Sequence, residues 1–217
     1  MEGRKIHMRI LKDPEERKAE ILDTAERLFT TKGYSKTTIM DILNEIGIAK
    51  GTFYYYFKSK EEVLDAIILR IVSTDVAEAK KIADNPNLSA IQKLFEILFT
   101  QKPKEGGRKE KMIEQFTQPN NAEMQQKGLV QSILHLTPIL TRVVEQGINE
   151  KVVVTDYPHE TVEFLLVSAQ VIFDEGLFHW DTEEAIRRAK AFISIMEKAL
   201  GTEKGSFDDM MKILINK

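Results

Sequence analysis

The sequence predicts an all-α protein with a small three-helix head at its amino-terminal end and a larger helical body. Apolar residues recur with the spacing of an α-helix along most of the 217 residues. The chain has only 11 glycines and 6 prolines, fewer than average usage, which disfavours a fold with many turns between strands. Residues 1–60 hold 12 Lys and Arg against 9 Asp and Glu, whereas residues 61–217 hold 19 against 25. A basic head on an acidic body is therefore predicted.

Three short helices are expected in the head. The first covers residues 14–33, where a one-sided apolar stripe lies between a proline and a glycine. The second begins after Thr38, which has the spacing of a capping box with Asp41, and it ends at a glycine. The third covers residues 48–56 and has room for about two turns before another capping-box spacing.

A long helix is expected to join the head to the body. Its apolar pattern runs from Lys60 to Ala83, and Asn85 and Pro86 end it. A short tail helix is expected after Ser206. The helical patterns in between cover residues 88–102, 108–117, 122–150, 158–179 and 182–200. The run 152–155 resembles a strand, but no partner strand is predicted for it.

We place a domain boundary between residues 59 and 60. Residues 1–59 then form a helix-turn-helix unit, because the second and third helices are joined through a glycine turn, and the second member of such a unit can lie in the DNA major groove. Residues 60–217 form the body. The basic segment 1–12 is expected to act as an arm on DNA, and a disordered, solvated terminus is the alternative.

The segment 50–60, KGTFYYYFKSK, concentrates side chains that contact nucleic acids. It holds three lysines, two hydroxyl side chains and three tyrosines, which reach phosphates and base edges. Helical spacing predicts instead that Phe53 and Phe57 are core residues. Lys60 has a second interpretation as the start of a solvated helix, because surface lysines are common.

The stretch TTIMDILNEIGIAKGTFYYYFKSKEEVLDAII resembles the DNA-binding signature of the TetR family (TetR/AcrR-like) of bacterial one-component regulators. The resemblance covers residues 14–70 in helix order, spacing and key residues, and the remainder is similar in helix number and length. It implies a transcriptional regulator that acts as a repressor. Such a protein binds a palindromic operator in double-stranded DNA as a homodimer, and a small apolar effector releases it.

The resemblance also implies roles for single residues of the head. Thr38 would meet the phosphate backbone at the start of the second helix. The third helix would face the groove with Lys50, Gly51, Thr52 and Tyr55, and phosphates would be bound by Tyr54, Tyr56 and Lys60. Ala49 stands where many relatives have a capping serine, so a cap typically worth ~1 kcal/mol is missing. We therefore expect the third helix to fray without DNA.

Two helices of the body are predicted to form a dimer surface. The segment 158–179 is apolar almost all round and so requires burial on two faces, and 182–200 adds small alanines that permit close approach. Together they resemble the family's two-helix dimer surface, which pairs into a four-helix bundle. The alternative is that both are core helices of a monomer. The expected interface residues are Phe164, Val171, Phe178, Ala189, Phe192, Ile193 and Met196.

A ligand pocket is expected between the head and the dimer surface. In relatives this region encloses a small-molecule cavity, and its Met and Phe content suits an apolar ligand. A stripe of such side chains can equally be plain core. The expected lining residues are Phe95, Phe99, Met112, Phe116, Met124 and His135.

Several function classes are disfavoured. Cysteine is absent, which excludes disulfides, thiolate zinc sites and a cysteine nucleophile, and indicates a cytoplasmic protein. The four histidines lack metal-ligand spacing and no catalytic motif is present, so we predict no catalytic residue, no metal and no cofactor. Asp174, Glu175 and His179 have a commonplace helical spacing. The apolar runs are too short for a membrane helix, and the start lacks the pattern of a signal peptide.

Two other functions stay open. One is a ligand-independent DNA-binding protein with an architectural or division-control role on the same fold. The other is an all-α enzyme, which is disfavoured because no set of residues supplies a reaction. An open pocket in the body would favour the ligand-responsive regulator over the architectural protein.

Overall fold

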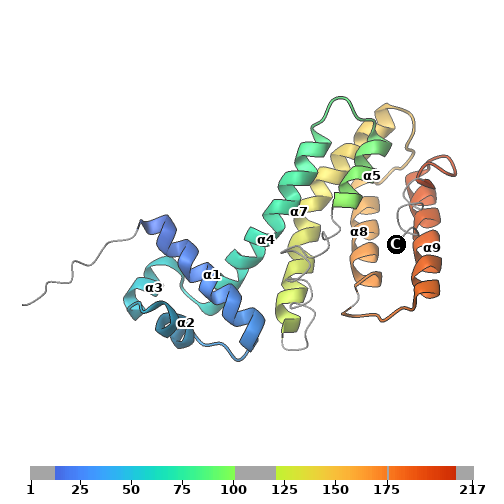
Figure 1. Cartoon of the computed structure of the whole chain (residues 1–217). Helices are drawn as coiled ribbons and strands as arrows, with labels where there is room; N and C mark the ends of the chain where they lie inside the picture. Colours follow the sequence, from blue (N-terminus) through green and yellow to red (C-terminus); the bar gives the residue numbers. More distant parts are fainter. Residues whose placement is uncertain (1–12, 101–120, 175, 209–217) are drawn as a thin grey trace, which may run out of the picture. The chain divides into compact units, whose positions relative to one another are not determined.

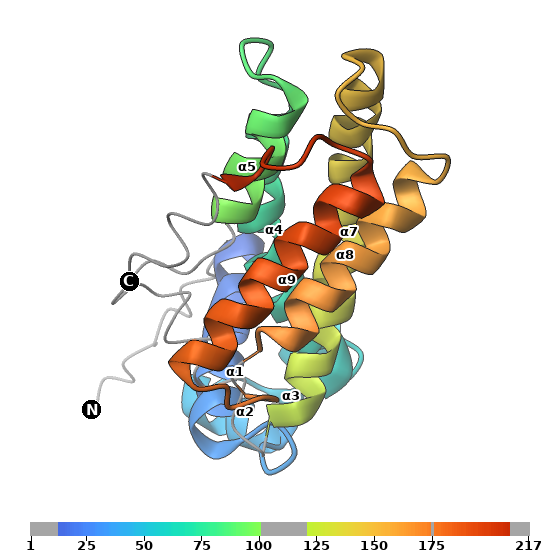
Figure 2. The ribbon, with the colours of Figure 1, turned by 90° about the vertical axis from the view of Figure 1, so that its right-hand side faces the viewer.

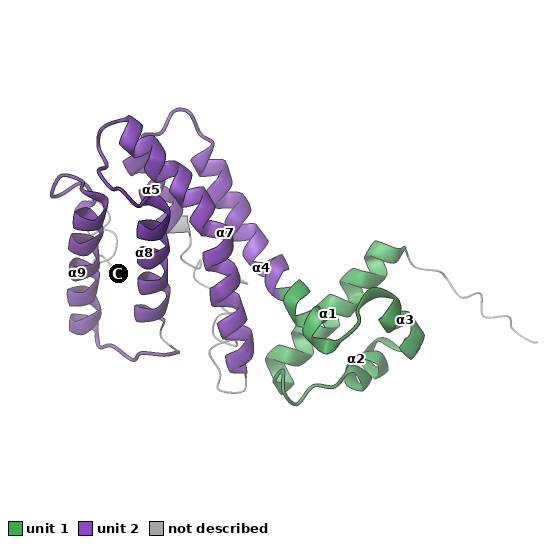
Figure 3. Ribbon diagram, turned by 180° about the vertical axis from the view of Figure 1, so that it is seen from behind, with its two compact units in different colours: residues 1–67 green, residues 68–217 purple. Residues whose placement is uncertain are grey.

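In the computed structural model of the chain, residues 13–100, 121–174 and 176–208 are described, and the regular elements among them are all helical (Figure 1). This confirms the predicted all-α class. The chain divides into two units, residues 1–67 and 68–217 (Figure 3). The first holds α1 (Pro14–Lys32), α2 (Ile39–Ile46) and α3 (Lys50–Tyr56), and α4 (Lys60–Ala83) begins there and continues into the second. The second also holds α5 (Ala90–Thr100), α7 (Ala122–Asn149), α8 (Pro158–Ile172) and α9 (Thr182–Leu200).

The division falls inside α4, whereas the predicted boundary lies at its start. The first turns of α4 fall in the first unit, and their residues Val63, Leu64 and Ile67 are fully buried. The other helices of the head also bury one apolar face each. Phe53 and Phe57 of the third-helix segment are 0% and 2% exposed, so the prediction that they are core residues is confirmed.

Local signals fix the ends of the head helices. The predicted capping box is present: the backbone N–H of Asp41 donates to Thr38 Oγ1, and the backbone N–H of Thr38 donates to the Asp41 carboxylate. Gly47 ends α2 in the left-handed conformation at φ 75°. The capping-box spacing before α4 is used in part. Ser59 Oγ accepts a hydrogen bond from the backbone N–H of Glu62, whereas the Glu62 carboxylate accepts from the backbone N–H of Lys58, the residue before Ser59.

The body is built around one apolar core. Helix α7 packs against α5 and α8, and α8 packs against α9 (Figure 2). The core contains Phe207, from the segment after α9, and Val153, from the loop before α8. Lys93 of α5 is buried as well, and its Nζ donates to Ala83 O at 2.7 Å and to Gln146 Oε1 at 2.8 Å. A polar contact thus holds the carboxyl end of α4 against the body.

Three expectations for the body differ from the structure or fall outside it. Helix α8 ends at Ile172 rather than at 179, because Asp174 Oδ1 accepts the N–H groups of Gly176 and Leu177 and turns the chain. The strand-like run 152–155 is a loop. The predicted helix 108–117, the arm 1–12 and most of the tail helix lie outside the described residues. No helix among the described residues has both the length and the apolar character needed to cross a membrane.

Candidate nucleic-acid interface

Helices α2 and α3 are joined by a tight turn in the manner of a helix-turn-helix unit. The N–H groups of Gly47 and Ile48 both donate to Leu43 O, at 2.9 and 3.1 Å, so the chain reverses directly after α2. Helix α3 then buries Phe53 and leaves most of its remaining surface open. The geometry therefore presents one face of a short helix to a partner.

The exposed face of α3 brings together the side chains that the sequence predicts for DNA. Tyr55 is 78% exposed and Tyr54 45% exposed, whereas Tyr56 is half-buried with its ring 4.9 Å from that of Tyr55. Lys50 is exposed, and its Nζ lies 5.7 Å from the centroid of the Tyr54 ring. Thr52 is half-buried. A cation, hydroxyls and aromatic faces thus share one surface, which suits phosphates and bases.

Gly51 lies on the same helix with open space around it. A Cβ built at this position meets no heavy atom within 4 Å, and its backbone angle is not of the left-handed type. Nothing within the described part of the chain therefore requires a glycine here. A glycine in the middle of a helix costs roughly 0.5–1 kcal/mol relative to alanine, and the groove-facing role of Gly51 stays a prediction.

Thr38 begins α2 inside a small charged cluster. Its Oγ1 and its backbone N–H both donate to Asp41 Oδ2, at 2.8 and 2.7 Å. Lys32 Nζ lies 2.7 Å from the same oxygen, and this bond, followed by those from Thr38, holds the pKa of Asp41 well below its ordinary value. The contact of Thr38 with a phosphate stays a prediction, and the structure shows that both of its donors are already used.

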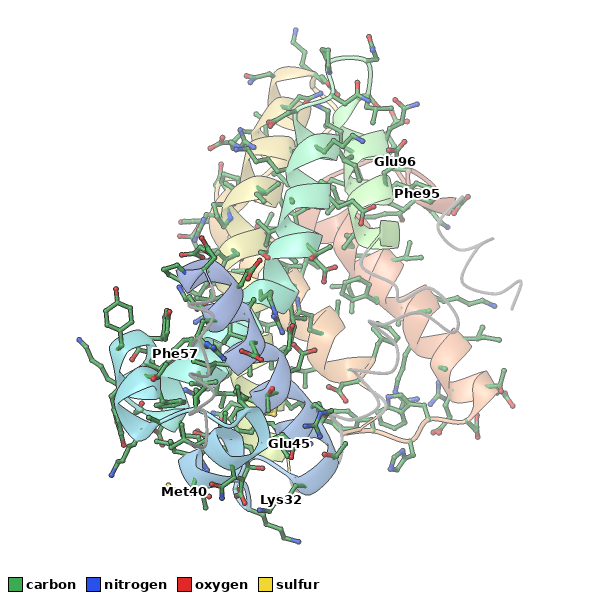
Figure 4. All side chains as sticks on the ribbon, turned by 60° about the vertical axis from the view of Figure 1, so that its left-hand side comes forward. Lys32, Met40, Glu45, Phe57, Phe95 and Glu96 are labelled. Atoms are coloured by element: carbon green, nitrogen blue, oxygen red, sulfur yellow. The ribbon has the colours of Figure 1, made fainter. Side chains whose placement is uncertain are left out.

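Lys32 is a further candidate for a contact with DNA that the sequence did not predict. Its side chain is 43% exposed, and Figure 4 shows Lys32 and Met40 at one edge of the first unit with their side chains projecting outward. The available signal was a basic residue in the last turn of α1, close in sequence to the start of α2. That signal is common at helix ends and does not by itself indicate a partner.

Lys60 occupies a different environment from the tyrosines. Its Nζ donates to Tyr34 O at 2.9 Å and to Thr37 O at 3.0 Å, and it lies 4.1 Å from the centroid of the Tyr34 ring. The predicted phosphate contact of Lys60 is not tested by these contacts, but they give the ammonium group an internal role. Tyr34 was missed by sequence reasoning because it is 26 residues away from Lys60.

The third helix lacks a side-chain cap, as its sequence predicts. Ala49 is the N-cap residue and makes no side-chain hydrogen bond. The N–H of Thr52 donates instead to Ala49 O at 2.9 Å, which tightens the first turn. Helix α3 is nevertheless formed over all of residues 50–56.

The described part of the body contains an apolar cavity of about 30 Å³, roughly the volume of one water molecule. It is lined by Leu94, Leu98, Leu140, Val144, Val162, Leu165, Leu166, Phe192, Met196 and Leu200. Of the predicted pocket residues whose side chains the structure describes, Phe95, Met124 and His135, none is among these lining residues. Phe95 is half-buried beside the core, Met124 is fully buried, and His135 is exposed with its Nδ1 2.8 Å from Gln131 O. Met112, Phe116 and the side chain of Phe99 lie outside the described residues.

The predicted dimer residues fall into two groups. Phe164 of α8 is 70% exposed and Val171 is half-buried, so both are available to a partner. By contrast, Ala189, Ile193 and Met196 are buried within the chain itself at 8%, 4% and 2% exposure, and Phe192 packs against the same core. Ala189, Ile193 and Met196 thus belong to the core of their own body, whereas Phe192 is half-buried, and the contact of these four residues with a second copy stays a prediction.

Phe178 also differs from its predicted setting. It lies beyond the end of α8, in the loop before α9, where its ring stacks on that of Trp180 with a centroid distance of 5.0 Å. The predicted position on a continuous helix 158–179 is therefore wrong, because the turn at Asp174 interrupts the helix.

Metal-ligating side chains do not cluster in the described residues. His179 is exposed, and His159 Nδ1 lies 3.4 Å from Thr141 Oγ1. Asp174 accepts from Gln125 Nε2 at 2.8 Å and from the turn that follows α8. These are structural contacts. None of them brings one of these groups within hydrogen-bonding distance of another carboxylate or imidazole.

Two family models match this chain. Residues 21–67 match the model described as "Bacterial regulatory proteins, tetR family", and residues 105–195 match "Tetracyclin repressor-like, C-terminal domain". The first match covers α2 and α3 with their flanking helices. The second covers much of the body.

Curated relatives are similar over the head. The HTH-type transcriptional repressor KstR2 of Mycobacterium tuberculosis is 35% identical over 82 residues, which are 36% of this chain and 40% of the relative. The uncharacterized HTH-type transcriptional regulator YerO of Bacillus subtilis is 53% identical over 49 residues, 23% of this chain and 17% of the relative. This chain thus matches less than half the length of either relative.

Solved structures share the fold over most of the chain. SmeT, the repressor of the Stenotrophomonas maltophilia multidrug efflux pump SmeDEF, has a TM-score of 0.58 at 20% identity, with 88% of this chain and 92% of SmeT covered. A SmeT–triclosan complex gives the same TM-score at 21% identity, with 88% and 94% covered. CprB from S. coelicolor A3(2) gives 0.52 at 21% identity, with 92% and 95% covered.

Proposed function

Because this chain belongs to the TetR family of bacterial regulatory proteins, we propose that it is a ligand-responsive transcriptional repressor and not an enzyme. It binds a palindromic operator in double-stranded DNA as a homodimer, and a small apolar effector releases it. The observation that carries the proposal is the exposed face of α3, where the exposed residues Lys50, Gly51, Tyr54 and Tyr55 lie together.

The DNA-binding part is tested with duplexes that the purified chain selects from a random-sequence pool. Affinity is then measured by fluorescence anisotropy at several salt concentrations. If paired heads neutralise six to ten phosphates, affinity should fall by roughly 10³- to 10⁵-fold between 50 and 200 mM salt. Failure to enrich any duplex, or an affinity that salt does not change, contradicts the proposal.

Base reading and phosphate binding are separated by substitution. Lys50→Ala or Thr52→Ala should change the preference among selected sites, because these side chains lie on or beside the exposed face of α3. Lys190→Ala is the matched control, since Lys190 is an exposed lysine of α9 in the body. Equal effects of Lys50→Ala and Lys190→Ala on site preference would contradict the assignment of α3 as the reading helix.

The homodimer is supported by an apolar stripe on α8. Phe164 and Val167 are 70% and 39% exposed, Val171 follows on the same face, and Ile195 of α9 is 58% exposed. Such a stripe is larger than single scattered apolar residues and marks an interface. Two-fold pairing through it would space two recognition helices for a palindromic site.

Sedimentation at micromolar concentration without DNA tests the dimer. Phe164→Glu should give a folded monomer, because the side chain is exposed in the chain and its loss removes no internal contact of the core. Val154→Glu is the control, since Val154 is 72% exposed in the loop before α8 and not on the stripe. A wild-type monomer, or a Phe164→Glu dimer, contradicts this part of the proposal.

The effector is supported by the apolar cavity in the body and by the SmeT–triclosan neighbour. A cavity lined only by aliphatic, Met and Phe side chains favours an apolar ligand. We propose that an effector binds a state of the body in which this cavity is wider, because a ligand that prefers one state shifts the population toward that state. Operator DNA must then weaken effector binding by the same factor as the effector weakens operator binding.

The small cavity is also the observation that favours a second candidate, a ligand-independent architectural or division-control protein. A thermal-shift screen of apolar compounds discriminates the two. A compound at 100 times its dissociation constant should stabilise the chain by about 2.7 kcal/mol. A hit that also lowers operator affinity supports the repressor. A hit whose affinity is identical with and without operator contradicts effector release.

A further inference from the structure

We propose that Lys60 is a positioning residue for DNA binding. Its ammonium group holds the turn that precedes α2, and it supports operator affinity through that turn rather than by contacting a phosphate. The inference rests on the proposed DNA-binding function and concerns how one residue of the head serves it.

The ammonium group of Lys60 is already coordinated by the protein. Nζ donates to Tyr34 O at 2.9 Å and to Thr37 O at 3.0 Å. The Tyr34 ring lies beneath it with its centroid 4.1 Å away, a cation–π contact. An ammonium group has three N–H donors, so two hydrogen bonds and one aromatic face use most of its capacity.

The two residues of the turn whose carbonyls Lys60 binds are both buried. Tyr34 is 3% exposed and packs edge-on against Phe29 with centroids 5.0 Å apart, and Thr37 is 1% exposed. The turn has its own hydrogen bonds, since Thr37 Oγ1 donates to Gly33 O at 2.8 Å and the N–H of Thr37 donates to Tyr34 O at 3.2 Å. Lys60 adds a charged donor to the carbonyls of Tyr34 and Thr37.

This turn sets the start of α2. Thr38 follows Thr37 directly and is the N-cap whose capping box with Asp41 begins the helix. A displaced Thr37 carbonyl would therefore displace the first turn of α2. Because α2 leads through the Gly47 turn into α3, the position of the recognition helix depends on the same anchor.

The carbonyls of Tyr34 and Thr37 use two of the three N–H donors of Lys60, so a phosphate would have to compete for the third or displace one of these acceptors. Displacement would take a charged hydrogen-bond donor from the carbonyl of a buried residue, which is unfavourable. The two roles make opposite predictions for a substitution at Thr37. Thr37 is buried and neutral, so it cannot contact DNA, but it belongs to the turn that Lys60 holds.

The test uses a duplex that the wild-type chain has selected from a random pool, with affinities measured at 50 and 200 mM salt. The variants are Lys60→Met, Thr37→Val, their double variant, and Lys58→Met as a control for loss of an exposed positive charge in the same segment. Loss of charged hydrogen bonds should weaken binding by Lys60→Met roughly tenfold or more. Thermal unfolding is recorded for each variant so that affinities are compared between folded proteins.

The positioning role predicts that the double variant binds no more weakly than the worse single variant, because both act through one turn. It also predicts that the ratio of wild-type to Lys60→Met affinity changes between 50 and 200 mM salt no more than the ratio of wild-type to Lys58→Met affinity does. If Lys60 instead contacts one phosphate in each head, the ratio of wild-type to Lys60→Met affinity should differ about 12-fold between the two salt concentrations. That result, or additive losses in the double variant, overturns the inference.

Two further outcomes are decisive. If Lys60→Met does not fold, Lys60→Gln carries the test, because its amide N–H groups can still donate to the carbonyls of Tyr34 and Thr37 but it has no charge: a loss that salt changes no more than the loss caused by Lys58→Met supports the inference, and a roughly 12-fold difference between the two salt concentrations overturns it. A wild-type chain that enriches no duplex overturns the proposed DNA-binding function, and the inference falls with it. If the wild-type chain enriches a duplex but Lys60→Met shows the salt dependence of a lost phosphate contact, the inference fails while the proposed function stands.

Discussion

Gly51 offers a substitution that should strengthen the free protein and weaken the complex. It is the second residue of α3, exposed, and a Cβ added there meets no atom within 4 Å. Alanine in place of a helical glycine reduces the conformational freedom of the unfolded chain without a clash in the folded one. Gly51→Ala should therefore be tolerated easily by the isolated protein.

The stabilisation expected from Gly51→Ala is roughly 0.5–1 kcal/mol. In a chain of this size that corresponds to a rise in melting temperature of roughly 1–4 °C. The effect on the complex has the opposite sign, since a methyl group forced into a closed interface costs on the order of 1–3 kcal/mol. A dimer carries the group twice, so operator affinity should fall at least about thirtyfold.

The chain supplies a matched control in Gly128. This glycine lies within α7, and a Cβ added there also meets no atom within 4 Å. Gly128→Ala should therefore give a similar gain in melting temperature with no change in operator affinity. Melting curves and anisotropy titrations of the two variants against wild type make the comparison.

The reasoning is refuted if Gly51→Ala binds the selected duplex as tightly as wild type does. It is refuted equally if Gly128→Ala weakens binding as much as Gly51→Ala, since the loss would then follow from helix stiffening rather than from contact with DNA. A lower melting temperature of Gly51→Ala would show that the glycine has an internal role.

Three further predictions concern stability. Asp41→Asn should destabilise the head at neutral pH. Because the pKa of folded Asp41 lies below its ordinary value of 3.8, the difference in unfolding free energy between wild type and variant, measured with urea, should be constant above that pH and should shrink below it. A difference that grows on acidification would contradict this. Ala49→Ser should supply the missing cap and raise the stability of α3 by ~1 kcal/mol, with tighter operator binding by anisotropy. Met196→Ala should lower the free energy of unfolding by about 2–5 kcal/mol, because Met196 is a core residue, whereas Lys190→Ala, at an exposed position of the same helix, should cost little.

The head was predictable because its signals are local. Capping residues, a glycine turn and the spacing of apolar side chains lie within a few positions of the elements they specify, and α2 and α3 form where those signals place them. The contact of Lys60 with the turn at Tyr34 has no such signal. It depends on how the start of α4 lies against the turn between α1 and α2, which the pattern of one helix does not reveal.

The body was predictable in its helices and less so in its surfaces. Apolar periodicity indicates that a face is buried, but not whether the chain's own core or a second copy covers it. Ile193 and Met196 were for this reason predicted at the interface and are found in the core. The sequence holds a signal for the end of α8, because an aspartate two residues before a glycine favours a turn. The apolar run through Val171, Ile172 and Phe173 predicted instead that the helix continues.

Helix α4 is the covalent path along which an effector in the body would influence the head, and both ends of it are held by lysines through backbone carbonyls. At its start, Lys60 binds the carbonyls of the turn before α2, and at its end the carbonyl of Ala83 accepts from the buried Lys93. The helix between them is continuous over 24 residues. Under the proposed function, an effector that changes the contacts of Lys93 acts on the helix whose other end Lys60 ties to the turn before α2.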